Sequence, residues 1–228
     1  CRQAGVRSET RVYPSTVTQA ELLGVVSELN DDEDVDGILV QLPLYAHLHA
    51  AAILDAIDPH KDVDGLHPVN VGRLWSGRPS LVPATPAGLI RIADHYEVPL
   101  EGTNVVIVGR SNLVGKPAAA LFLARNATVT VAHSRTRDLA TQTRSADVLV
   151  AAAGRPGMIR RDMVKAGAVV LDVGQSPVEG TLRGDVADEV AEVAGAITPT
   201  PGGTGPMTVA MVIANTVTAA KARRGETA

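Results

Sequence analysis

The sequence predicts an α/β protein in which helices pack against a parallel sheet. Two observations carry this prediction. Short apolar runs rich in valine alternate with segments of helical length, a pattern that favours right-handed crossovers between parallel strands. Aromatic residues make up only 2% of the 228 residues. Such a composition favours helices and buried strands packed through small side chains, and not an all-β sandwich.

Composition also excludes several classes of function. The chain has 21 Lys and Arg against 25 Asp and Glu, a net charge of −4, which argues against a nucleic-acid partner. No run approaches the roughly 18 apolar residues of a membrane-spanning helix. The single cysteine, Cys1, excludes an internal disulfide and favours a reducing compartment, the cytoplasm. No His or carboxylate spacing suggests a metal site. We expect a soluble protein with a small-molecule ligand.

The first part of the chain predicts a small α/β unit. Thr18 and Glu21 form a capping box ahead of apolar residues at helical spacing, which predicts a helix over residues 18–29. The continuous apolar run 38–40 predicts a strand buried on both faces. A second helix is expected over residues 48–57.

From residue 86 onwards the alternation of strands and helices becomes regular. The predicted strands span residues 105–108, 128–131, 147–152 and 168–173, and the predicted helices span residues 86–96, 116–124 and 207–223. We therefore expect a nucleotide-binding domain of the Rossmann-like, parallel-sheet kind at residues 86–204. Residues 1–85 and 205–228 are expected to form a smaller α/β domain.

The segment from Val108 to Pro117 joins the first strand of the larger domain to its helix. Gly109 and Gly115 let the main chain come close to a phosphate, and the helix N-terminus supplies oriented N–H groups. Ser111 stands where the usual Gly-x-Gly-x-x-Gly motif has its second glycine. Spacing alone therefore does not separate dinucleotide binding from an ordinary strand-to-helix turn.

The end of the next strand favours NADP over NAD. An NAD enzyme places a carboxylate about 20 residues on, to bind the ribose 2′-hydroxyl. This chain instead has His133, Ser134 and Arg135. Together with Arg110, the latter two can hold a 2′-phosphate through charge-assisted hydrogen bonds, while His133 shapes the loop. A solvated pair of surface arginines is the alternative.

Three further loops carry groups suited to a binding site. The motif Gln-Leu-Pro-Leu at residues 41–44 follows the first predicted strand, at the end where open α/β sheets bind ligands. The motif Lys-Asp-Val-Asp-Gly at residues 61–65 lies in a long predicted loop, residues 58–80; alone, such a run is usually a solvated turn. Residues 198–208 hold three prolines and three glycines, which suit close approach to a flat ligand or a stiff interdomain linker.

Taken together, these motifs closely resemble those of the bifunctional methylenetetrahydrofolate dehydrogenase/methenyltetrahydrofolate cyclohydrolase family. The matching segments run from Gln41 to Leu44, from Lys61 to Gly65, from Gly109 to Pro117 and from Pro201 to Thr208. Their order and spacing match over essentially the whole chain. Two departures are minor: Ala84 stands where the family usually has cysteine, and Thr204 where it usually has valine.

The resemblance implies a set of site residues. Those implied to bind NADP are Gly109, Arg110, Ser111, Val114, Gly115, His133, Ser134, Arg135, Ala152, Gly154 and Gly174. Gln41 and Asp64 are implied to be catalytic, and the carboxylate of Asp64 also accepts two hydrogen bonds from the pterin ring of tetrahydrofolate. The residues implied to line the folate site near the nicotinamide are Pro201, Gly202, Gly203 and Thr208. A homodimer formed through the cofactor domain and a role in one-carbon metabolism and purine biosynthesis are implied as well.

The implied reactions are the NADP-dependent oxidation of 5,10-methylenetetrahydrofolate and the hydrolysis of the methenyl product to 10-formyltetrahydrofolate. The hydride step chiefly requires the nicotinamide to be held face to face with the folate. Hydrolysis needs proton transfer, which in the family falls to the lysine of a Tyr-x-x-x-Lys motif oriented by Gln41.

That lysine motif is not in this sequence. By resemblance it would lie just upstream of Cys1, with the first strand and helix of the substrate domain, so we expect a segment to precede Cys1. A truncated or non-catalytic protein that binds NADP and folate without turnover is the alternative. A dehydrogenase without cyclohydrolase activity that uses NAD is a third possibility, against which Ser134 and Arg135 argue.

Overall fold

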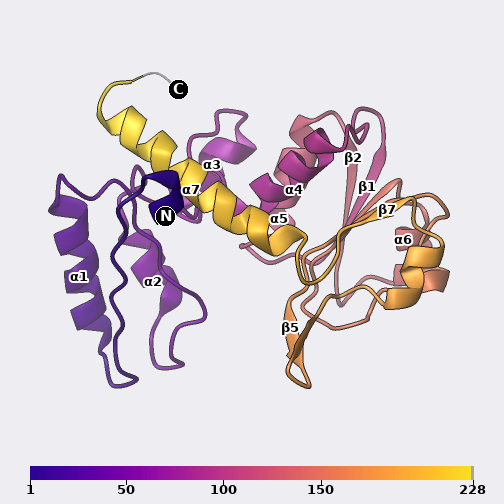
Figure 1. Ribbon diagram of the computed structural model, residues 1–228, viewed down its shortest axis with the longest axis horizontal. Helices are drawn as coiled ribbons and strands as arrows, with labels where there is room; N and C mark the ends of the chain where they lie inside the picture. Colours follow the sequence, from indigo (N-terminus) through magenta and orange to yellow (C-terminus); the bar gives the residue numbers. More distant parts are fainter. Residues whose placement is uncertain (227–228) are drawn as a thin grey trace. The chain divides into compact units, whose positions relative to one another are not determined.

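Five parallel strands form the main sheet, in the order β2-β1-β3-β4-β7. They are β1 (Asn104–Val108), β2 (Thr128–Ala132), β3 (Val148–Ala151), β4 (Val169–Asp172) and β7 (Ala196–Ile197). In the register of the sheet, Val106 of β1 lies between Thr130 of β2 and Leu149 of β3. The computed structural model, which describes residues 1–226, thus confirms the predicted α/β class (Figure 1).

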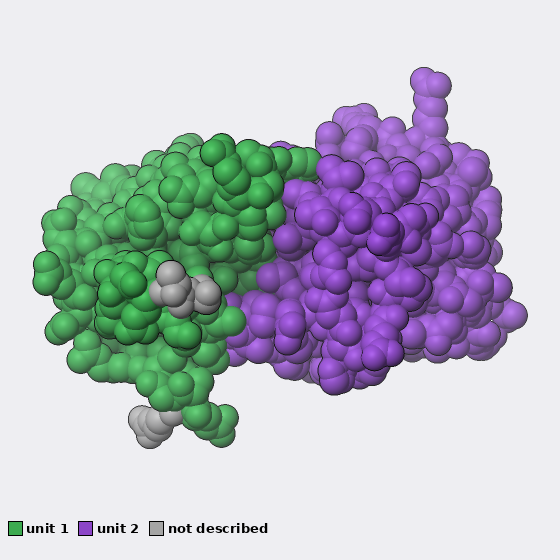
Figure 2. Space-filling view, turned by 90° about the horizontal axis from the view of Figure 1, so that it is seen from above, with its two compact units in different colours: residues 1–84, 212–228 green, residues 85–211 purple. Residues whose placement is uncertain are grey.

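The chain divides into two units, which Figure 2 distinguishes by colour. Unit 1 consists of residues 1–84 and 212–228, and unit 2 of residues 85–211. The helices that lie in unit 1 are η1 (Arg2–Ala4), α1 (Gln19–Asp31), α2 (Ala50–Asp55) and α3 (Pro68–Trp75). The last helix, α7 (Thr204–Arg223), begins in unit 2 and ends in unit 1.

Unit 2 holds the main sheet and the elements that cover it. Its helices are α4 (Ala84–His95, of which the first residue counts with unit 1), α5 (Gly115–Ala124), α6 (Leu139–Arg144), η2 (Arg161–Met163) and η3 (Asp188–Glu192). An antiparallel hairpin of β5 (Ser176–Val178) and β6 (Thr181–Arg183) extends away from the sheet (Figure 1). No helix in residues 1–226 combines the length and the apolar character that crossing a membrane requires.

Apolar clusters cover both faces of the main sheet. Val106 and Val108 of β1 pack on one face with residues of η2 and η3, whereas Val105 and Ile107 pack on the other face with Phe122 of α5. Alternate residues of a strand point to opposite faces, so a strand covered on both sides carries an uninterrupted apolar run. This is why the sequence locates β1 and β3 within one or two residues.

The predicted capping box at the start of α1 is confirmed. The Oγ1 of Thr18 accepts a 3.2 Å hydrogen bond from the main-chain N–H of Glu21, and the Glu21 carboxylate accepts one of 2.8 Å from the N–H of Thr18. Hydrogen bonds that this carboxylate accepts from the N–H and the hydroxyl of Thr18 lower the pKa of the Glu21 carboxyl group. Val26 is buried in the core of unit 1, on the face that the apolar spacing predicts.

Two predictions for unit 1 are wrong. Residues 58–80 are not a continuous loop, because they contain α3; its N-cap is His67, whose Nδ1 accepts a 3.1 Å hydrogen bond from the N–H of Val69. Histidine is not among the residues that usually cap helices, so this start is easily missed. The run 38–40 is not a strand buried on both faces: only Ile38 is paired, in a bridge to Asp62, and Leu39 is 43% exposed.

Three helices begin two or three residues from their predicted starts, and one of them is α4, which begins at Ala84 and not at residue 86. The second helix is α2, which is shorter than residues 48–57 because His49 is its N-cap. Helix α7 begins at Thr204 and not at residue 207. Pro206 lies in its first turn, where a missing N–H costs nothing. The loop predicted at residues 198–208 therefore ends at Gly203, and Thr208 lies within the helix.

Candidate functional site

The loop between β1 and α5 is a tight turn that requires both of its glycines. Gly109 has a φ of 134°, and a side chain there would overlap the carbonyl group of Ala152. A side chain at Gly115 would overlap the carbonyl oxygen of Gly109. The N–H of Gly109 donates a 2.8 Å hydrogen bond to Ala132 at the end of β2. The loop is thus fixed against the two neighbouring strands, with no room for a Cβ atom at either glycine.

The same loop leaves hydrogen-bond donors free at the N-terminus of α5. Its N-cap, Val114, supplies no side-chain cap, and the Oγ of Ser111 accepts a 3.1 Å hydrogen bond from the N–H of Val114. Within residues 1–226, no group accepts a hydrogen bond from the main-chain N–H groups between Arg110 and Leu113. Free N–H groups beside a helix N-terminus suit an anion such as a phosphate.

A second turn, at the carboxyl end of β2, presents Ser134 and Arg135 to solvent. The N–H of Arg135 donates a 3.1 Å hydrogen bond to Nδ1 of His133, and the N–H of His133 donates one of 2.8 Å to Oγ1 of Thr136. The imidazole of His133 thus shapes the loop, as predicted from the sequence. The side chains of Ser134 and Arg135 are exposed and remain available to a ligand.

The first two strand ends bring two cations to one edge of the sheet. Val108 of β1 is paired with Ala132 of β2, and Arg110 and Ser134 each follow their strand by two residues. Neither Arg110 nor Arg135 forms an ion pair with any carboxylate of the described chain. Two unpaired guanidinium groups at neighbouring strand ends favour a doubly charged anion.

The remaining candidate residues of unit 2 follow β3, β4 and β7. Gly154, with a φ of 65°, has open space where a Cβ would be, while a side chain at Gly174 would overlap Asp185. Pro201 and Gly202 are exposed in the loop before α7. The Oγ1 of Thr208 lies 3.0 Å from that of Thr85. Because the strands are parallel, all these segments leave the sheet at its carboxyl edge, where α/β sheets bind ligands.

The other two candidate residues, Gln41 and Asp64, belong to unit 1. The parallel bridge between Ile38 and Asp62 lies just before both of them, and the N–H of Ile38 donates a 2.7 Å hydrogen bond to the oxygen of Lys61. Both residues therefore leave the bridge in the same direction. Gln41 is exposed, and its Nε2 donates a 3.1 Å hydrogen bond to the main-chain oxygen of Leu42.

Asp64 is half-buried and free to bind a ligand. Its carboxylate accepts no hydrogen bond from any residue that the structure describes. Burial, and secondly the negative charge of Asp62, raise the pKa of its carboxyl group. A desolvated carboxylate without internal donors favours a ligand that supplies two N–H groups.

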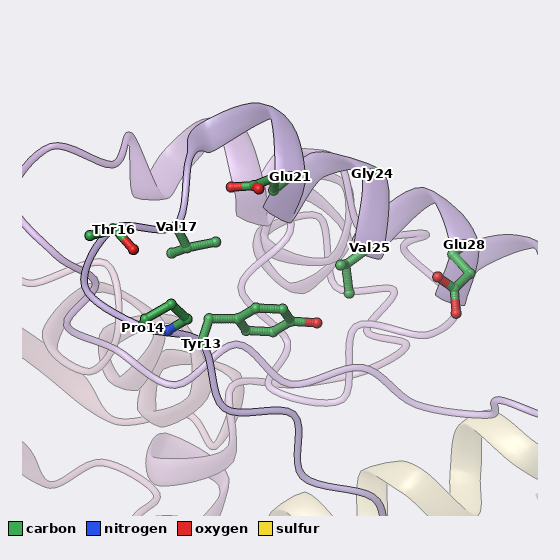
Figure 3. Close-up of a pocket in the computed structure, with 8 residues that line it drawn as sticks. All are labelled: Tyr13, Pro14, Thr16, Val17, Glu21, Gly24, Val25 and Glu28. Carbon is green, nitrogen blue, oxygen red and sulfur yellow. The ribbon is translucent and has the colours of Figure 1, made fainter.

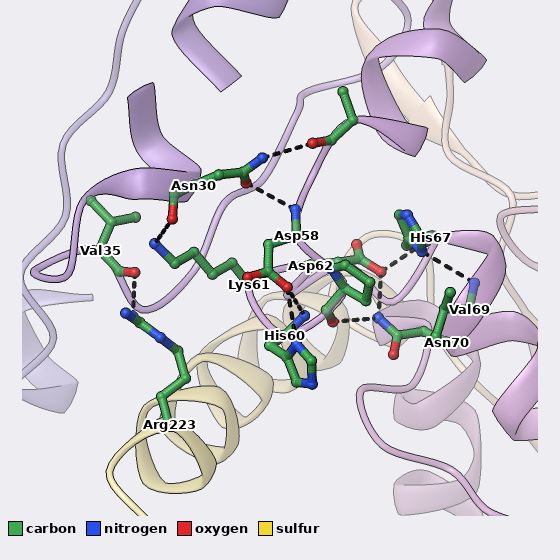
Figure 4. Close-up of polar contacts among 12 residues, drawn as sticks. Asn30, Val35, Asp58, His60, Lys61, Asp62, His67, Val69, Asn70 and Arg223 are labelled. Carbon is green, nitrogen blue, oxygen red and sulfur yellow. Dashed lines mark hydrogen bonds and ion pairs between the residues drawn. The ribbon is translucent and has the colours of Figure 1, made fainter. Parts of the chain in front are cut away.

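The motif around Asp64 is not a solvated turn, because Lys61 and Asp62 are each only 2% exposed. Figure 4 shows the contacts that hold them. The carboxylate of Asp62 accepts hydrogen bonds of 2.8 Å from the N–H of His67 and 2.9 Å from Nδ2 of Asn70. The buried amide of Asn70 also donates a 2.8 Å hydrogen bond to the main-chain oxygen of Pro59.

A groove of about 460 Å³ lies elsewhere in unit 1, between α1 and the segment that precedes it (Figure 3). Its lining residues are Tyr13, Pro14, Thr16, Val17, Glu21, Gly24, Val25 and Glu28. None of them was predicted from the sequence to bind a ligand. Within residues 1–226, no group of three His, Cys, Asp or Glu side chains is placed to hold a metal ion.

Comparison with known families matches both units. The model of the tetrahydrofolate dehydrogenase/cyclohydrolase catalytic domain matches residues 1–64, and that of the NAD(P)-binding domain of the same family matches residues 83–224. The bifunctional protein FolD of Thermus thermophilus is 57% identical over 98% of this chain and 79% of its own length. FolD of Koribacter versatilis is 51% identical over 100% of this chain and 81% of its own length.

Solved structures agree with these relatives. The bifunctional FolD dehydrogenase/cyclohydrolase of Campylobacter jejuni has a TM-score of 0.89 and 48% identity, over 92% of this chain and 75% of its own. The Trypanosoma brucei methylenetetrahydrofolate dehydrogenase-cyclohydrolase, solved with NADP and an inhibitor, has a TM-score of 0.86 and 43% identity, over 92% of this chain and 74% of its own.

Proposed function

Since the chain belongs to the tetrahydrofolate dehydrogenase/cyclohydrolase family, it is an NADP-dependent bifunctional enzyme, and we propose a role for each residue of its two candidate sites. Its reactions are the oxidation of 5,10-methylenetetrahydrofolate to the methenyl form and the hydrolysis of that product to 10-formyltetrahydrofolate. The alternative of a non-catalytic binding protein is not favoured.

The carboxyl edge of the main sheet fits NADP. We assign the pyrophosphate to the free N–H groups after Arg110, because Gly109 and Gly115 let the main chain approach it. The single observation that carries the preference for NADP is the pair of exposed, unpaired cations, Arg110 and Arg135, at neighbouring strand ends. With Ser134 they supply charge-assisted hydrogen bonds to the 2′-phosphate.

Other residues of this edge complete the proposed cofactor site. Ser111 and Val114 shape the loop before α5, and His133 shapes the loop after β2. Ala152, Gly154 and Gly174 are assigned to the site at the ends of β3 and β4, and the space beside Gly154 is open. When bound, NADP supplies the hydride acceptor.

The carboxylate of Asp64 is proposed to bind the pterin ring of the substrate. The pterin ring of tetrahydrofolate displays an amino group and a ring N–H side by side, and the two oxygens of the Asp64 carboxylate accept from both. This carboxylate is half-buried and accepts no hydrogen bond from the described residues, which supports the assignment. We assign the remaining folate contacts to Pro201, Gly202, Gly203 and Thr208.

Gln41 is proposed to serve the hydrolysis. Its side-chain oxygen accepts no hydrogen bond within the described chain and is exposed, so it can orient the attacking water and the group that takes its proton. Hydride transfer needs chiefly the alignment of two rings, and it depends less on Gln41.

Roles for the two domains, an oligomeric state and a compartment are proposed as well. Residues 86–204 are assigned to the cofactor and residues 1–85 with 205–228 to the substrate. A homodimer through the cofactor domain is supported by β2, an edge strand on which Val131 is exposed, and by the exposed Leu123 of α5. Light scattering that shows a monomer at micromolar concentration would refute the dimer. The cytoplasm is the proposed compartment. The proposed use of the 10-formyl product is as a donor of its formyl group in purine biosynthesis.

One assay tests both activities in the same samples. The purified protein is given 5,10-methylenetetrahydrofolate and NADP, and the formation of NADPH and the decay of the methenyl intermediate are followed together. Both signals are expected to exceed those of a sample without protein. Binding of NADP without either signal would support the non-catalytic alternative instead.

A further inference from the structure

Two buried carboxylates of unit 2 lack a cation. Asp172 is 3% exposed and Asp185 is 0% exposed, and no Lys, Arg or His of the described chain forms an ion pair with either. Burying an unpaired charge is costly unless hydrogen bonds compensate it. Burial raises the pKa of the Asp172 carboxyl group above its ordinary value, and hydrogen bonds from the main chain offset only part of this rise. The compensation for both carboxylates comes from main-chain N–H groups.

Asp185 fixes the loop that follows β3. Its carboxylate accepts hydrogen bonds from three successive N–H groups, those of Ala153 at 2.6 Å, Gly154 at 2.8 Å and Arg155 at 2.7 Å. Successive N–H groups that converge in this way form a concave anion site, often used for phosphates. Here an internal carboxylate fills it, so these N–H groups are not available to the phosphates of a cofactor.

Asp172 closes the base of the β5–β6 hairpin. Its Oδ1 accepts hydrogen bonds from the N–H of Gly174 at 2.9 Å and from that of Asp185 at 3.0 Å, and its Oδ2 accepts one from Val186 at 3.1 Å. Gly174 precedes the hairpin, whereas Asp185 and Val186 follow it. The carboxylate of Asp172 therefore holds both ends of the hairpin together. It also fixes the position of the main chain at Asp185.

The main chain of Asp172 extends the same network to the loop before α7. Its N–H donates a 2.8 Å hydrogen bond to Oγ1 of Thr198, and its oxygen accepts one of 2.9 Å from Oγ1 of Thr204. The segments after β3, β4 and β7 are thus linked through two aspartates.

Two glycines make this close packing possible. A side chain at Gly184 would overlap the carboxylate of Asp172, and one at Gly174 would overlap Asp185. A larger residue at either position would push a carboxylate away from its N–H donors.

We propose that Asp172 and Asp185 are positioning residues of the NADP site. They touch neither reacting group, but they hold the segments of Gly154 and Gly174 in the shape that receives the cofactor. It follows that the phosphates of NADP are held by the loop before α5 and not by the N–H groups after β3. The inference rests on the proposed function of these loops.

The test is Asp185→Asn, which keeps the size of the side chain but turns an NH₂ group toward N–H donors. We expect the dissociation constant for NADP, measured by calorimetry, to rise roughly tenfold or more. The KM for NADP should rise in parallel, while kcat at saturating NADP and the KM for the folate change less than about twofold. The control is Asp188→Asn, an acid whose side chain is 92% exposed, which should leave all four constants unchanged.

A second measurement needs no variant. In the unliganded wild-type protein, the amide hydrogens of Ala153, Gly154 and Arg155 should exchange slowly with solvent, because Asp185 accepts their hydrogen bonds. Fast exchange there, or an Asp185→Asn protein that binds NADP as tightly as the wild type, would overturn the inference. A wild-type protein that does not bind NADP at all would instead overturn the proposed function on which it rests.

Discussion

The Nζ of Lys61 lies 2.6 Å from the main-chain oxygen of Asn30 (Figure 4). The same ammonium group donates to the oxygens of Leu29 at 2.9 Å and Asp32 at 2.7 Å. These are carbonyls at the C-terminal end of α1, which have no partners within the helix and carry the negative end of its dipole. A buried cation therefore ties α1 to the segment that carries Asp64.

Replacing Lys61 by methionine removes this cation while keeping an unbranched apolar side chain. We expect Lys61→Met to lower the free energy of unfolding by roughly 1.5 to 3 kcal/mol, since carbonyl oxygens lose a charged donor. The KM for the folate should rise, because Asp64 follows Lys61 by three residues. Urea unfolding and steady-state kinetics measure the two effects. Lys221→Met, at an exposed lysine, should change stability by less than about 0.5 kcal/mol.

Replacing Arg135 by alanine tests the preference for NADP. Arg135→Ala should weaken NADP binding by roughly 1.5 to 3 kcal/mol, the value of a hydrogen bond to a charged group, and leave NAD binding nearly unchanged. Calorimetric titration with both cofactors measures the difference. Arg91→Ala, at an exposed arginine of α4, is the matched control. An equal loss of NAD and NADP affinity would contradict the assignment of the 2′-phosphate.

A pair of glycine variants separates crowding from backbone conformation. Gly109 and Gly102 both have positive φ values, 134° and 73°, but only at Gly109 would a Cβ overlap another group. Gly102→Ala should cost about 1 to 2 kcal/mol, the penalty for a left-handed residue with a side chain. Gly109→Ala should cost clearly more and also weaken NADP binding. Thermal unfolding and calorimetry measure both, and equal costs would show that the loop can open.

The raised pKa of Asp64 predicts a pH-dependent gain from Asp64→Asn. A carboxyl group with a higher pKa in the folded than in the unfolded protein favours folding while protonated, and that contribution is lost as the pH rises through the raised pKa. At neutral pH the ionised Asp64 carboxylate therefore lowers the free energy of unfolding. Asp64→Asn should raise the unfolding midpoint at pH 7, with the gain shrinking toward the ordinary carboxyl pKa of about 3.9.

The same variant should bind the folate less tightly, because an amide presents one acceptor where the pterin offers two donors. Asp34→Asn, at an exposed carboxylate of the same unit, should leave the KM for the folate unchanged. If Asp64→Asn were less stable than the wild type at pH 7, burial of this carboxylate would not be the cost inferred here.

Replacing Gln41 by alanine should separate the two activities. Gln41→Ala is expected to slow hydrolysis of the methenyl compound by roughly 10- to 100-fold, since that step needs an oriented water and proton transfer. The dehydrogenase rate should fall much less. The paired assay of NADPH formation and methenyl decay measures the ratio directly. Equal losses in the two rates would assign Gln41 to substrate binding and not to hydrolysis.

The part of the fold that the sequence predicts best is the part buried on both faces. Strands β1 and β3 are covered by apolar clusters on either side, so a local apolar run is sufficient to locate them. Helix α3 was missed because its signals, a histidine cap and a first-turn proline, lie in a stretch rich in turn formers. The apolar run 38–40 led to a wrong strand prediction, because only one of its residues, Ile38, forms a bridge.

The candidate site likewise contains residues that the local sequence predicts and residues that it does not. Gly109 and Gly115 follow from the local logic of a strand, a tight turn and a helix, and their geometry meets that expectation. Asp185 does not, because its three donors lie 30 to 32 residues earlier in the chain. No periodicity or local motif marks an acid that will accept hydrogen bonds from a distant loop, so only the folded structure reveals it.

The division of unit 1 into two stretches of sequence affects how the chain is made. Asn215 of α7 donates 2.8 Å hydrogen bonds to the oxygens of Val63 and Val82, and Ala219 packs against Val63 and Leu81. The ribosome releases all of unit 2 between these partners, so unit 2 can fold during translation as one continuous stretch. Unit 1 cannot close its apolar cluster until residues 212–219 have emerged. Until then Val63 and Leu81 lack their partners from α7 and stay accessible to water and to chaperones, although all of unit 2 has been synthesised.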